Sequence, residues 1–512
     1  MALINVENLG ELGIVKDIPS YQLPQNAWSD GNNVRTLDNA IKKVDGYQEI
    51  ISSCPVTAYF VAPLESGSNY FWIAAGLTKV YAHDGSSWSN ITRQTAGSDV
   101  DYSATAAKSW TACVVGGVLI LDNGVDDPQE WPLTSGAASA STRLQDLSNW
   151  PASTECEVMR SFKTFLIALD VTKSSVNYSR LVKWSHEAAT QATPTSWDES
   201  DGTKSTGEYE LASSPGRVID GIPVGDNFLI LKDDSCYLMS YVGTPFIFSF
   251  DIISSTIGCL AKNCAAEYEA GAFFMGNSDL YSTDGRTITP LLPNRLRRYL
   301  TDNLSGTNYN RCVVVPDYTR KEMLACFPTT SATYCDKAII WNWDTNTFTL
   351  RDLPAISHAT YGVKAIASDY DSNLLNVVFV DPGNAKIFRD NYGNTKDGTN
   401  MTSFISREGW SMNGEGINDA HAVKQLRAIY PKMTVSGSDT VNFYVAAVMD
   451  ADDTISWGSA ITFEPNSQGK VPCRATGRYI GVKIESTTDV DWKLHGLQLD
   501  VINKGIRGGQ SY

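Results

Sequence analysis

Short apolar runs separated by turn residues fill most of the first 390 residues of the chain. They are clearest in residues 264–292, where each apolar or β-branched run spans four to six residues and each break contains Gly, Asn or Asp. The break at Asp284-Gly285 is a strong hairpin signal, because these residue types readily adopt the positive φ of tight turns. The pattern predicts a small antiparallel meander, which must stack against copies of itself to bury both faces.

Degenerate copies of this meander recur along the chain. Residues 56–93 repeat its phrase of Tyr, two further residues, Asp-Gly and a β-rich run. Further copies lie at residues 312–353 and 365–389, with weaker units at residues 110–132, 158–184 and 218–253. About seven units of roughly 25 to 45 residues match the period of propeller blades. An ordinary β-sandwich is the alternative, but some 340 residues of meander exceed the usual size of one sandwich.

The pattern changes after a polar linker at residues 391–400. Beyond it, longer runs alternate between apolar and polar positions, as in residues 441–445 and 479–484. Such alternation is typical of strands with one buried and one wet face, and five or more of them predict a compact β-sandwich. We therefore expect an all-β chain in three parts. These are an N-terminal extended arm and hairpin (1–46), a β-propeller of six or seven degenerate blades (47–395) and a C-terminal β-sandwich (396–512).

The N-terminal part contains few residues that could form a core of their own. Residues 23–34 combine Trp28 with a Ser-Asp-Gly turn, which predicts an extended arm, and residues 33–44 predict a hairpin. Because such an arm gains little from lying on its own subunit, Trp28 is our candidate oligomer-interface residue. The alternative is that the arm closes the propeller or the sandwich of its own chain.

One short helix is predicted in the propeller region, where Leu296 and Leu300 lie four residues apart. Three cations, Arg295, Arg297 and Arg298, fall on its other face. A phosphate or partner contact is one interpretation, and a solvated helix face or local salt bridges is the other.

Charge narrows the range of partners. The 41 Lys and Arg residues face 57 Asp and Glu residues, which gives a formal net charge of −16 at pH 7. Residues 396–512 carry 12 of these cations and 13 of the anions, so 29 cations against 44 anions lie before them. A surface like this does not grip a nucleic-acid backbone, since phosphate affinity requires clustered cations. The acidic charge is still compatible with a surface along which nucleic acid slides without being bound.

The ten cysteines are scattered without Cys-x-x-Cys pairs, several of them at apolar strand positions such as Cys113 and Cys312. Buried free thiols behave as small hydrophobes, and we expect them here instead of disulfides or metal ligands. The N-terminus lacks the basic and long apolar regions of a secretory signal, and the apolar run at residues 114–121 is too short to span a bilayer. We expect a soluble protein, made in a reducing cytoplasm and not inserted into a membrane.

No constellation of catalytic or ligand-binding residues stands out. The five histidines form no His-x-x-x-His pair, no Ser has Gly at both −2 and +2, and no phosphate-binding Gly-rich loop occurs. Residues 83–88 approach the Asp-box of sialidase propellers, but Asp84 and Gly85 are adjacent where that box separates them. Acidic residues are abundant, yet sequence alone cannot bring a glycosidase pair together. We therefore predict no enzyme activity, no cofactor and no metal site, which favours a structural role.

Several phrases resemble one family, the propeller-type structural proteins of tailed phage. The nearest members are the tail nozzle (tail tubular) or head-completion stabilising proteins of short-tailed phage. The resemblance begins with AWSDGNNVR at residues 27–35 and KKVDGY at residues 42–47. It continues through residues 160–168, 180–185, 241–248, 257–259, 295–304, 337–343, 475–484 and 492–496. These phrases cover most of the chain in order and contain no catalytic motif, so no functional residue is carried over.

The resemblance implies a homo-oligomeric ring, a homohexamer, in the tail of a virion below the portal and adaptor rings. It would close the DNA channel and conduct double-stranded DNA during ejection without sequence-specific binding, and tail fibre or needle proteins would attach to it. The acidic charge agrees with a conduit, because an acidic wall repels phosphate. Two other classes stay open: a phage receptor-binding or glycan-degrading propeller, and a protein-binding propeller scaffold.

Overall fold

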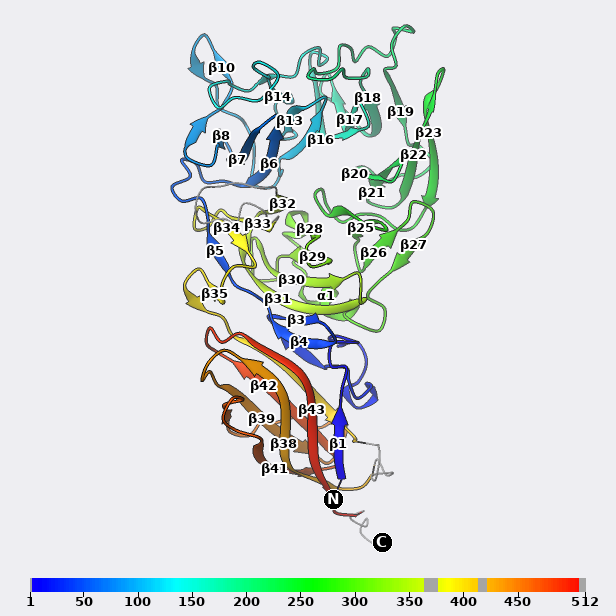
Figure 1. Cartoon of the computed structure of the whole chain (residues 1–512). Coiled ribbons are helices and arrows are strands. Elements are labelled where there is room, and N and C mark those ends of the chain that lie inside the picture. Colours follow the sequence, from blue (N-terminus) through cyan, green and yellow to red (C-terminus); the bar gives the residue numbers. More distant parts are fainter. Residues whose placement is uncertain (1, 363–375, 413–420, 506–512) are drawn as a thin grey trace.

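The computed structural model describes residues 2–362, 376–412 and 421–505 (Figure 1). Nearly all of its regular structure is strand, which confirms the all-β prediction. Figure 1 shows two bodies, a ring of small sheets above and two packed sheets below. No helix in the described ranges is long and apolar enough to cross a membrane.

The upper body is a β-propeller whose described residues form seven blades, six of them four-stranded antiparallel sheets and the seventh part of a six-stranded sheet. Blades 1 and 2 consist of β6 (Phe60–Ser66), β7 (Asn69–Ala75), β8 (Val80–His83) and β9 (Trp88–Asn90), then β12 (Thr111–Val115), β13 (Val118–Asp122), β14 (Gln129–Trp131) and β15 (Gln145–Asp146). Blades 3 and 4 consist of β16 (Thr154–Phe162), β17 (Phe165–Lys173), β18 (Val176–Trp184) and β19 (Gly207–Glu210), then β20 (Val218–Val224), β21 (Asn227–Lys232), β22 (Cys236–Gly243) and β23 (Ile247–Ser254). Blades 5 and 6 consist of β24 (Ala265–Tyr268), β25 (Gly271–Met275), β26 (Leu280–Thr283) and β27 (Ile288–Pro290), then β28 (Val313–Asp317), β29 (Glu322–Phe327), β30 (Cys335–Asn342) and β31 (Thr347–Ile356).

Blade 7 is completed by a strand from the N-terminal part of the chain. It consists of β32 (His358–Gly362), β33 (Asn376–Asp381), β34 (Lys386–Asp390) and β5 (Tyr47–Glu49). β5 runs antiparallel to β34, with Glu49 opposite Phe388. The first strand of blade 7 contacts the first strand of blade 1, so the ring is closed. Two short hairpins extend this body, β10 (Gln94–Thr95) with β11 (Ser98–Asp99), and β35 (Thr395–Lys396) with β36 (Thr399–Asn400).

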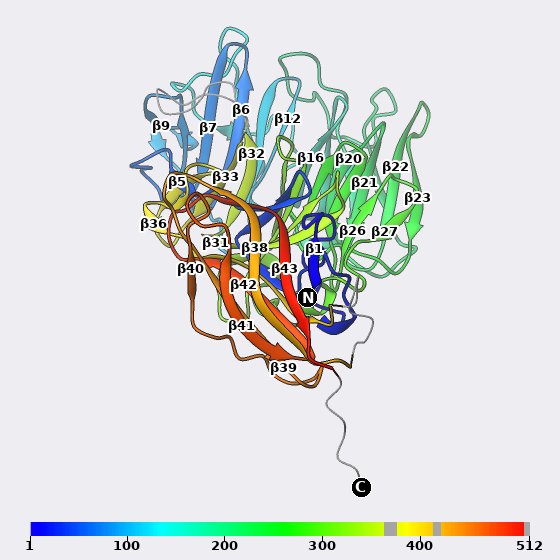
Figure 2. The ribbon, with the colours of Figure 1, turned by 60° about the horizontal axis from the view of Figure 1, so that its bottom comes forward.

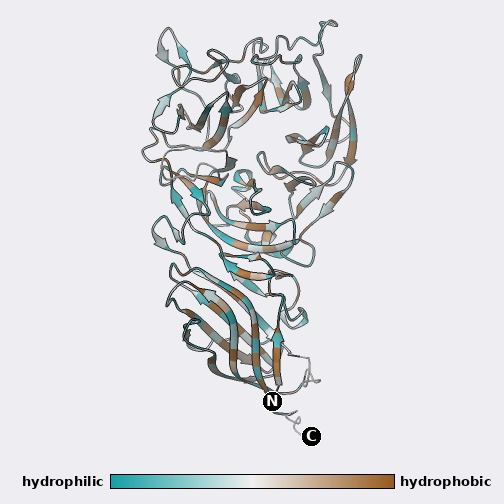
Figure 3. Cartoon of the chain, viewed as in Figure 1, coloured by the Kyte–Doolittle hydropathy of each residue, from teal (hydrophilic) through white to brown (hydrophobic). Residues whose placement is uncertain are grey.

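The lower body is a β-sandwich of two sheets. One sheet contains β1 (Ala2–Val6), β3 (Val34–Leu37), β4 (Ala40–Lys43), β38 (Lys424–Val435), β41 (Val471–Gly477) and β43 (Trp492–Asn503). The other contains β2 (Asp30–Asn32), β37 (Ser403–Trp410), β39 (Val441–Val448), β40 (Ile461–Phe463) and β42 (Tyr479–Ser486). Figure 2 shows β1, β43 and β38 side by side in the first sheet. Hydrophobic and hydrophilic residues alternate along the sandwich strands in Figure 3, as one buried and one wet face require.

The N-terminal segment belongs to this sandwich and does not form a separate arm. β1 and β4 pair with β43, and β2 pairs with β37. Trp28 is only 1% exposed, its indole N–H donates to the carbonyl of Leu9 at 2.8 Å, and its ring centroid lies 6.5 Å from that of Trp410. Two alternatives were open for this segment, an interface with another subunit or closure of its own chain's propeller or sandwich. In the structure the segment closes the sandwich of its own chain. Trp28 is therefore a core residue, because strands from beyond residue 400 supply the core that its local sequence lacks.

The same segment joins the sandwich to the propeller. The backbone N–H of Ile14 donates to the carbonyl of Phe348 at 2.8 Å, and that of Asn33 donates to the carbonyl of Leu350 at 2.8 Å. Both acceptors lie on β31 of blade 6. Gly13 has a φ of +68°, and a Cβ atom there would lie 2.6 Å from the Phe348 carbonyl oxygen, so only glycine fits this approach. One hydrophobic core runs without interruption through the sandwich and blades 4 to 6.

Buried polar contacts lie at the same junction, one set within the propeller and one set between the propeller and the sandwich. Arg351 on β31 donates from Nη1 to Asp390 Oδ2 on β34 at 2.7 Å, and both side chains are inaccessible to solvent. Arg35 on β3 donates to the Asn391 side chain at 2.6 Å and lies 3.6 Å from the carboxylate of Glu322. The Arg351–Asp390 pair joins blades 6 and 7, and the Arg35 contacts fix the sandwich against these two blades.

The described helical segments are short: α1 (Arg297–Asn303) and the 3-10 turns η1 (Ser20–Gln22) and η2 (Tyr309–Arg311). Arg297 donates from Nε to Asp279 Oδ2 at 2.8 Å, and the Arg295 guanidinium lies 5.2 Å from the ring centroid of Phe348. For Arg297 the local salt bridge is therefore the correct interpretation. All ten cysteines are free, and seven of them are buried.

We predict that Trp28→Ala lowers the free energy of unfolding by about 3–5 kcal/mol, because it removes a large buried ring and its hydrogen bond. Urea titration followed by circular dichroism measures this loss. Trp88→Ala, at a partly exposed ring in blade 1, is the control and should cost less. A Trp28→Ala protein of unchanged stability that fails to oligomerise would restore Trp28 to a subunit interface.

Candidate functional site

The first strands of the seven blades enclose an axial channel of about 510 Å³. Apolar residues such as Pro63, Val114, Ile222, Ala266 and Val314 line it, but polar atoms expose nearly as much of the wall surface as apolar atoms do. Each first strand pairs with the second strand of its blade and has no strand on its other side among the described residues. A hollow of this size falls in the range of small-ligand sites, roughly 300–1,000 Å³.

A charged clasp, formed by Arg160, Asp220 and Asn263, stands at one end of the channel. Arg160 on β16 donates from Nε and Nη2 to the two carboxylate oxygens of Asp220 on β20, at 2.9 Å each. Its Nη2 also donates to the side-chain oxygen of Asn263 at 2.9 Å. The Asp220 carboxylate is fully buried and accepts two further bonds of 2.7 Å, from the backbone N–H groups of Gly221 and Asn263. Such dense hydrogen bonding offsets the cost of burying a charged pair.

Asn263 links five blades. It precedes β24 of blade 5 and contacts Arg160 of blade 3 and Asp220 of blade 4. Its side-chain amide donates to the carbonyl of Trp110, at the entry to blade 2, at 3.2 Å. Its own carbonyl accepts from the N–H of Val314 in blade 6 at 2.9 Å. A φ of 60° at Asn263 lets one residue reach all these partners, and Asn tolerates this conformation better than most residues.

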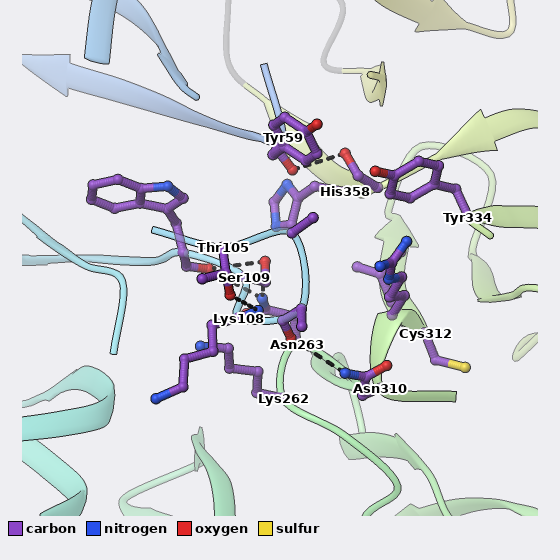
Figure 4. Close-up of a pocket in the computed structure, with 16 residues that line it drawn as sticks. Tyr59, Thr105, Lys108, Ser109, Lys262, Asn263, Asn310, Cys312, Tyr334 and His358 are labelled. Carbon is purple, nitrogen blue, oxygen red and sulfur yellow. Dashed lines mark hydrogen bonds between the residues drawn. The ribbon is translucent and has the colours of Figure 1, made fainter. Parts of the chain in front are cut away.

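Beyond the clasp lies a smaller pocket of about 20 Å³, shown in Figure 4. Asn263 and His358 line both this pocket and the channel. Tyr59 and Tyr334 approach each other edge to face with centroids 6.4 Å apart, and the Ser357 hydroxyl donates to the Tyr59 carbonyl at 2.8 Å. This volume holds about one water molecule, so the clasp end of the channel is nearly closed.

His358 is buried where the two hollows meet. Its ring lies 4.1 Å from that of Phe60, and its Nδ1 has no hydrogen-bond partner in the described part of the chain. Burial lowers the pKa of His358 to about 3, so the imidazole is neutral at pH 7. A general base needs a pKa near the working pH, and His358 is therefore poorly suited to that role.

The lysines at the clasp end are held by neighbours. Lys108 donates to the Gly124 carbonyl at 3.0 Å and to the Glu157 carboxylate at 2.5 Å. Lys262 donates to the Glu157 carbonyl at 3.3 Å and lies near the buried carboxyl of Asp122. Burial raises the pKa of Asp122 to about 6, although the Lys262 charge opposes the shift. These lysines lock blades 2, 3 and 5 together and are not free to hold an anion.

The opposite end of the channel carries Glu267 and Tyr318. Both line the channel, and the Tyr318 hydroxyl donates to the Glu267 carbonyl at 2.9 Å. The Tyr318 ring is 40% exposed and lies 5.0 Å from Tyr361 and 6.1 Å from Trp343, centroid to centroid. Burial raises the pKa of the Glu267 carboxyl. This end is therefore aromatic, acidic and open to solvent.

The channel is better arranged for binding than for bond-breaking. Glu267 is the one carboxylate residue among the described residues that line it, and the nearby Asp220 is committed to Arg160. Glycoside hydrolysis uses two carboxyl groups about 5–10 Å apart across the scissile bond. Among the described residues, no group of three His, Cys, Asp or Glu side chains could hold a metal ion.

Sequence reasoning did not assign any residue of the channel. Trp28, the one predicted site residue, lies in the sandwich core. The missed signal is a single charged residue that interrupts an apolar first strand, such as Arg160 after Val158-Met159 or Asp220 after Val218-Ile219. A charge at a buried strand position requires a partner, and the strand pattern alone does not identify it.

Comparison with known proteins gives only distant likenesses. No family model matches the chain, and no curated protein matches it. The CNH domain of AfRom2 is 8% identical over 67% of this chain and 97% of that domain, with a TM-score of 0.36. PorZ, a surface component of the type-IX secretion system of Porphyromonas gingivalis, is 8% identical over 73% of this chain and 44% of its own, with a TM-score of 0.34. Apo AztD from Citrobacter koseri is 12% identical over 64% and 85%, with a TM-score of 0.35. Likenesses this distant carry no argument about function.

We predict that Asp220→Asn costs about 3–5 kcal/mol of unfolding free energy, because Arg160 is left as a buried charge without its counter-ion. Chemical denaturation measures the loss. Asp226→Asn is the matched control, since the Asp226 side chain is fully exposed and lies 3.9 Å from its nearest cation. Similar stabilities of the two variants would show that the clasp does not hold the blades together.

We also predict that Asp122 makes stability depend on pH. Its pKa is raised from 3.8 to about 6 in the folded state, so folding favours the protonated carboxyl. This contribution is complete below about pH 4 and is lost as pH rises through about 6, by at most about 3 kcal/mol. Asp122→Asn retains an acceptor for the Gly124 N–H and should flatten the urea midpoint between pH 4 and pH 7. Identical pH profiles of wild type and variant would contradict the assignment.

Proposed function

We propose that this chain is a structural virion protein of the nozzle or head-completion class of short-tailed phage. In this role it forms a homo-oligomeric ring at the distal end of the head-to-tail connector, closes the DNA channel and conducts double-stranded DNA during ejection. The sequence phrases described above support the class. One structural observation supports assembly, namely an exposed apolar surface on blades 3 and 4.

This blade 3–4 surface consists of large apolar or aromatic side chains on the outer strands and the β22–β23 turn. Its members are Tyr209, Tyr241, Val242, Phe246 and Ile252, all at least 45% exposed and Phe246 at 76%. Figure 1 shows β22 and β23 at the periphery of the propeller, at the upper right. Grouped apolar side chains at such a place are typical of protein–protein contact sites.

The exposed rings are backed by a fixed aromatic core. Tyr209 stacks on Phe250 with centroids 4.6 Å apart and planes 7° from parallel. Trp184 meets Phe248 edge to face at 5.4 Å, and Tyr241 lies 5.9 Å from Phe248. Side chains held in place before contact lose little conformational entropy on binding, which favours association.

The outer edge of β23 adds to the case for assembly. β23 ends the sheet of blade 4, and no described strand pairs with its outer side. Its sequence, Ile247–Ser254, contains no Lys, Arg or Pro, the residues that usually protect an edge from pairing. An unprotected edge beside exposed aromatic residues is suited to permanent contact with a neighbouring subunit.

The DNA path in this proposal runs through the lumen of the ring, between subunits. The propeller's own channel of about 510 Å³ is sized for a small ligand and has the clasp across one end. The net charge of −16 supports a wall that repels phosphate and lets DNA slide. Adaptor or portal-proximal ring proteins and tail fibre or needle proteins are the other partners that the proposal requires.

We predict that replacing Phe246 and Ile252 together by Ser weakens self-association roughly tenfold or more, because both side chains lose apolar contact area. Sedimentation velocity and negative-stain imaging of the purified protein measure the ring fraction. Val176→Ser, at another exposed apolar residue of blade 3, is the control and should leave assembly unchanged. A wild-type protein that stays monomeric alone and with its adaptor ring, and is absent from virions, would rule out the nozzle function.

A further inference from the structure

Glu267 is an exposed carboxylate residue that lines the open end of the channel. In the described part of the chain its carboxylate has neither an ion-pair partner nor a hydrogen-bond donor, and burial is the cause that raises its pKa. Many other described carboxylates at blade junctions are paired, as Asp220 is with Arg160 and Asp390 with Arg351. A cation brought to Glu267 from outside could pair with the carboxylate without displacing any partner within the described part of the chain.

One aromatic residue of the channel lining, Tyr318, belongs to a cluster of rings beside this end of the channel. Tyr318 lies 5.0 Å from Tyr361, and Tyr268 lies 5.7 Å from Trp343, which is itself 6.1 Å from Tyr318. Tyr318 is both exposed and part of the channel lining, so one ring face is accessible from solvent. Aromatic faces attract ammonium and guanidinium groups, most strongly where water is partly excluded.

The rest of the channel suits the body of such a ligand. Beyond Glu267 the wall combines apolar side chains with polar groups up to the clasp, where the charges of Arg160 and Asp220 are satisfied by each other. The first strands also turn an unpaired edge toward the axis, with backbone N–H and C=O groups that an extended peptide can use. A free amine would leave those groups and most of the 510 Å³ unused.

We propose that the axial channel binds an extended apolar segment of a partner protein that carries a Lys or Arg side chain, with the cation at Glu267 between Tyr318 and its neighbouring rings. The apolar residues of the segment fill the wall toward the clasp. The acidic charge of the chain favours the approach of a basic segment. This inference is independent of ring assembly, because the channel lies within one subunit.

The test is calorimetric titration of the full-length protein with the capped peptide Leu-Val-Lys-Val-Leu. Two probes are compared with it: the same peptide with norleucine in place of Lys, and n-hexylammonium chloride. We expect the Lys peptide to bind, the norleucine peptide to bind about tenfold more weakly, and n-hexylammonium to bind more weakly still.

Variants locate the site. Glu267→Gln keeps the shape and removes the charge, and it should weaken the Lys peptide about tenfold while leaving the norleucine peptide unchanged. Glu269→Gln, two residues on and outside the channel lining, is the matched control and should bind like wild type. Ala266→Trp, which fills the wall, should abolish binding of both peptides, and thermal unfolding checks that each variant is folded.

Three results would overturn the proposal. Equal binding of the Lys and norleucine peptides would remove the role of the cation. Binding of n-hexylammonium as tight as that of the peptide would make the channel a site for small amines, and no binding by any probe at millimolar concentration would leave the channel without this ligand class. None of these results bears on whether the protein forms rings.

Discussion

The whole structure depends on one constraint, which is that the N-terminal segment of the chain belongs to both bodies. β1 to β4 complete the two sheets of the sandwich, and β5 supplies the fourth strand of blade 7. Without β5, blade 7 would lack its fourth strand and β34 would be an open edge. Neither body can therefore reach its final form before residues from opposite ends of the chain meet. Closing such long loops costs entropy before the contacts between the distant segments can form and offset it. We therefore infer slow folding with late coupling of the two bodies.

Polar residues placed inside the core make that coupling specific. The Arg351–Asp390 pair joins blades 6 and 7, and Asn263 with its partners Arg160 and Asp220 joins blades 2 to 6 around the axis. A buried ion pair contributes little net stability relative to apolar packing, but a mismatched one is costly. These residues thus penalise wrong blade order or register more than they stabilise the correct one. Apolar strand faces alone would tolerate several arrangements of seven similar blades.

Local sequence patterns predicted most of the blades because nearly every blade is formed by strands that are consecutive in the sequence. The hairpin expected at Asp284-Gly285 is present between β26 and β27, since turn chemistry and strand length are set by neighbouring residues. The partners of Trp28 were not predictable in this way, because Trp410 lies nearly four hundred positions away. β5 escaped notice for a related reason, as three residues are too few for a strand pattern. Residues 365–375, part of one expected blade, lie outside the described residues, and β33 and β34 form the remainder of that unit.

The residues of the channel were likewise not predictable from the sequence. Their chemistry depends on which blades meet when the propeller closes. Residues that hold blades together must pair within the protein, so the clasp end is occupied by charges that satisfy one another. Glu267 contributes to no blade contact of that kind, and its carboxylate is exposed at the open end of the channel without a charged partner among the described residues. The outer surface of blades 3 and 4 has an apolar counterpart, because Phe246 is 76% exposed and is little buried within its own subunit. Exposed residues that the fold does not need are where contacts with other molecules are expected.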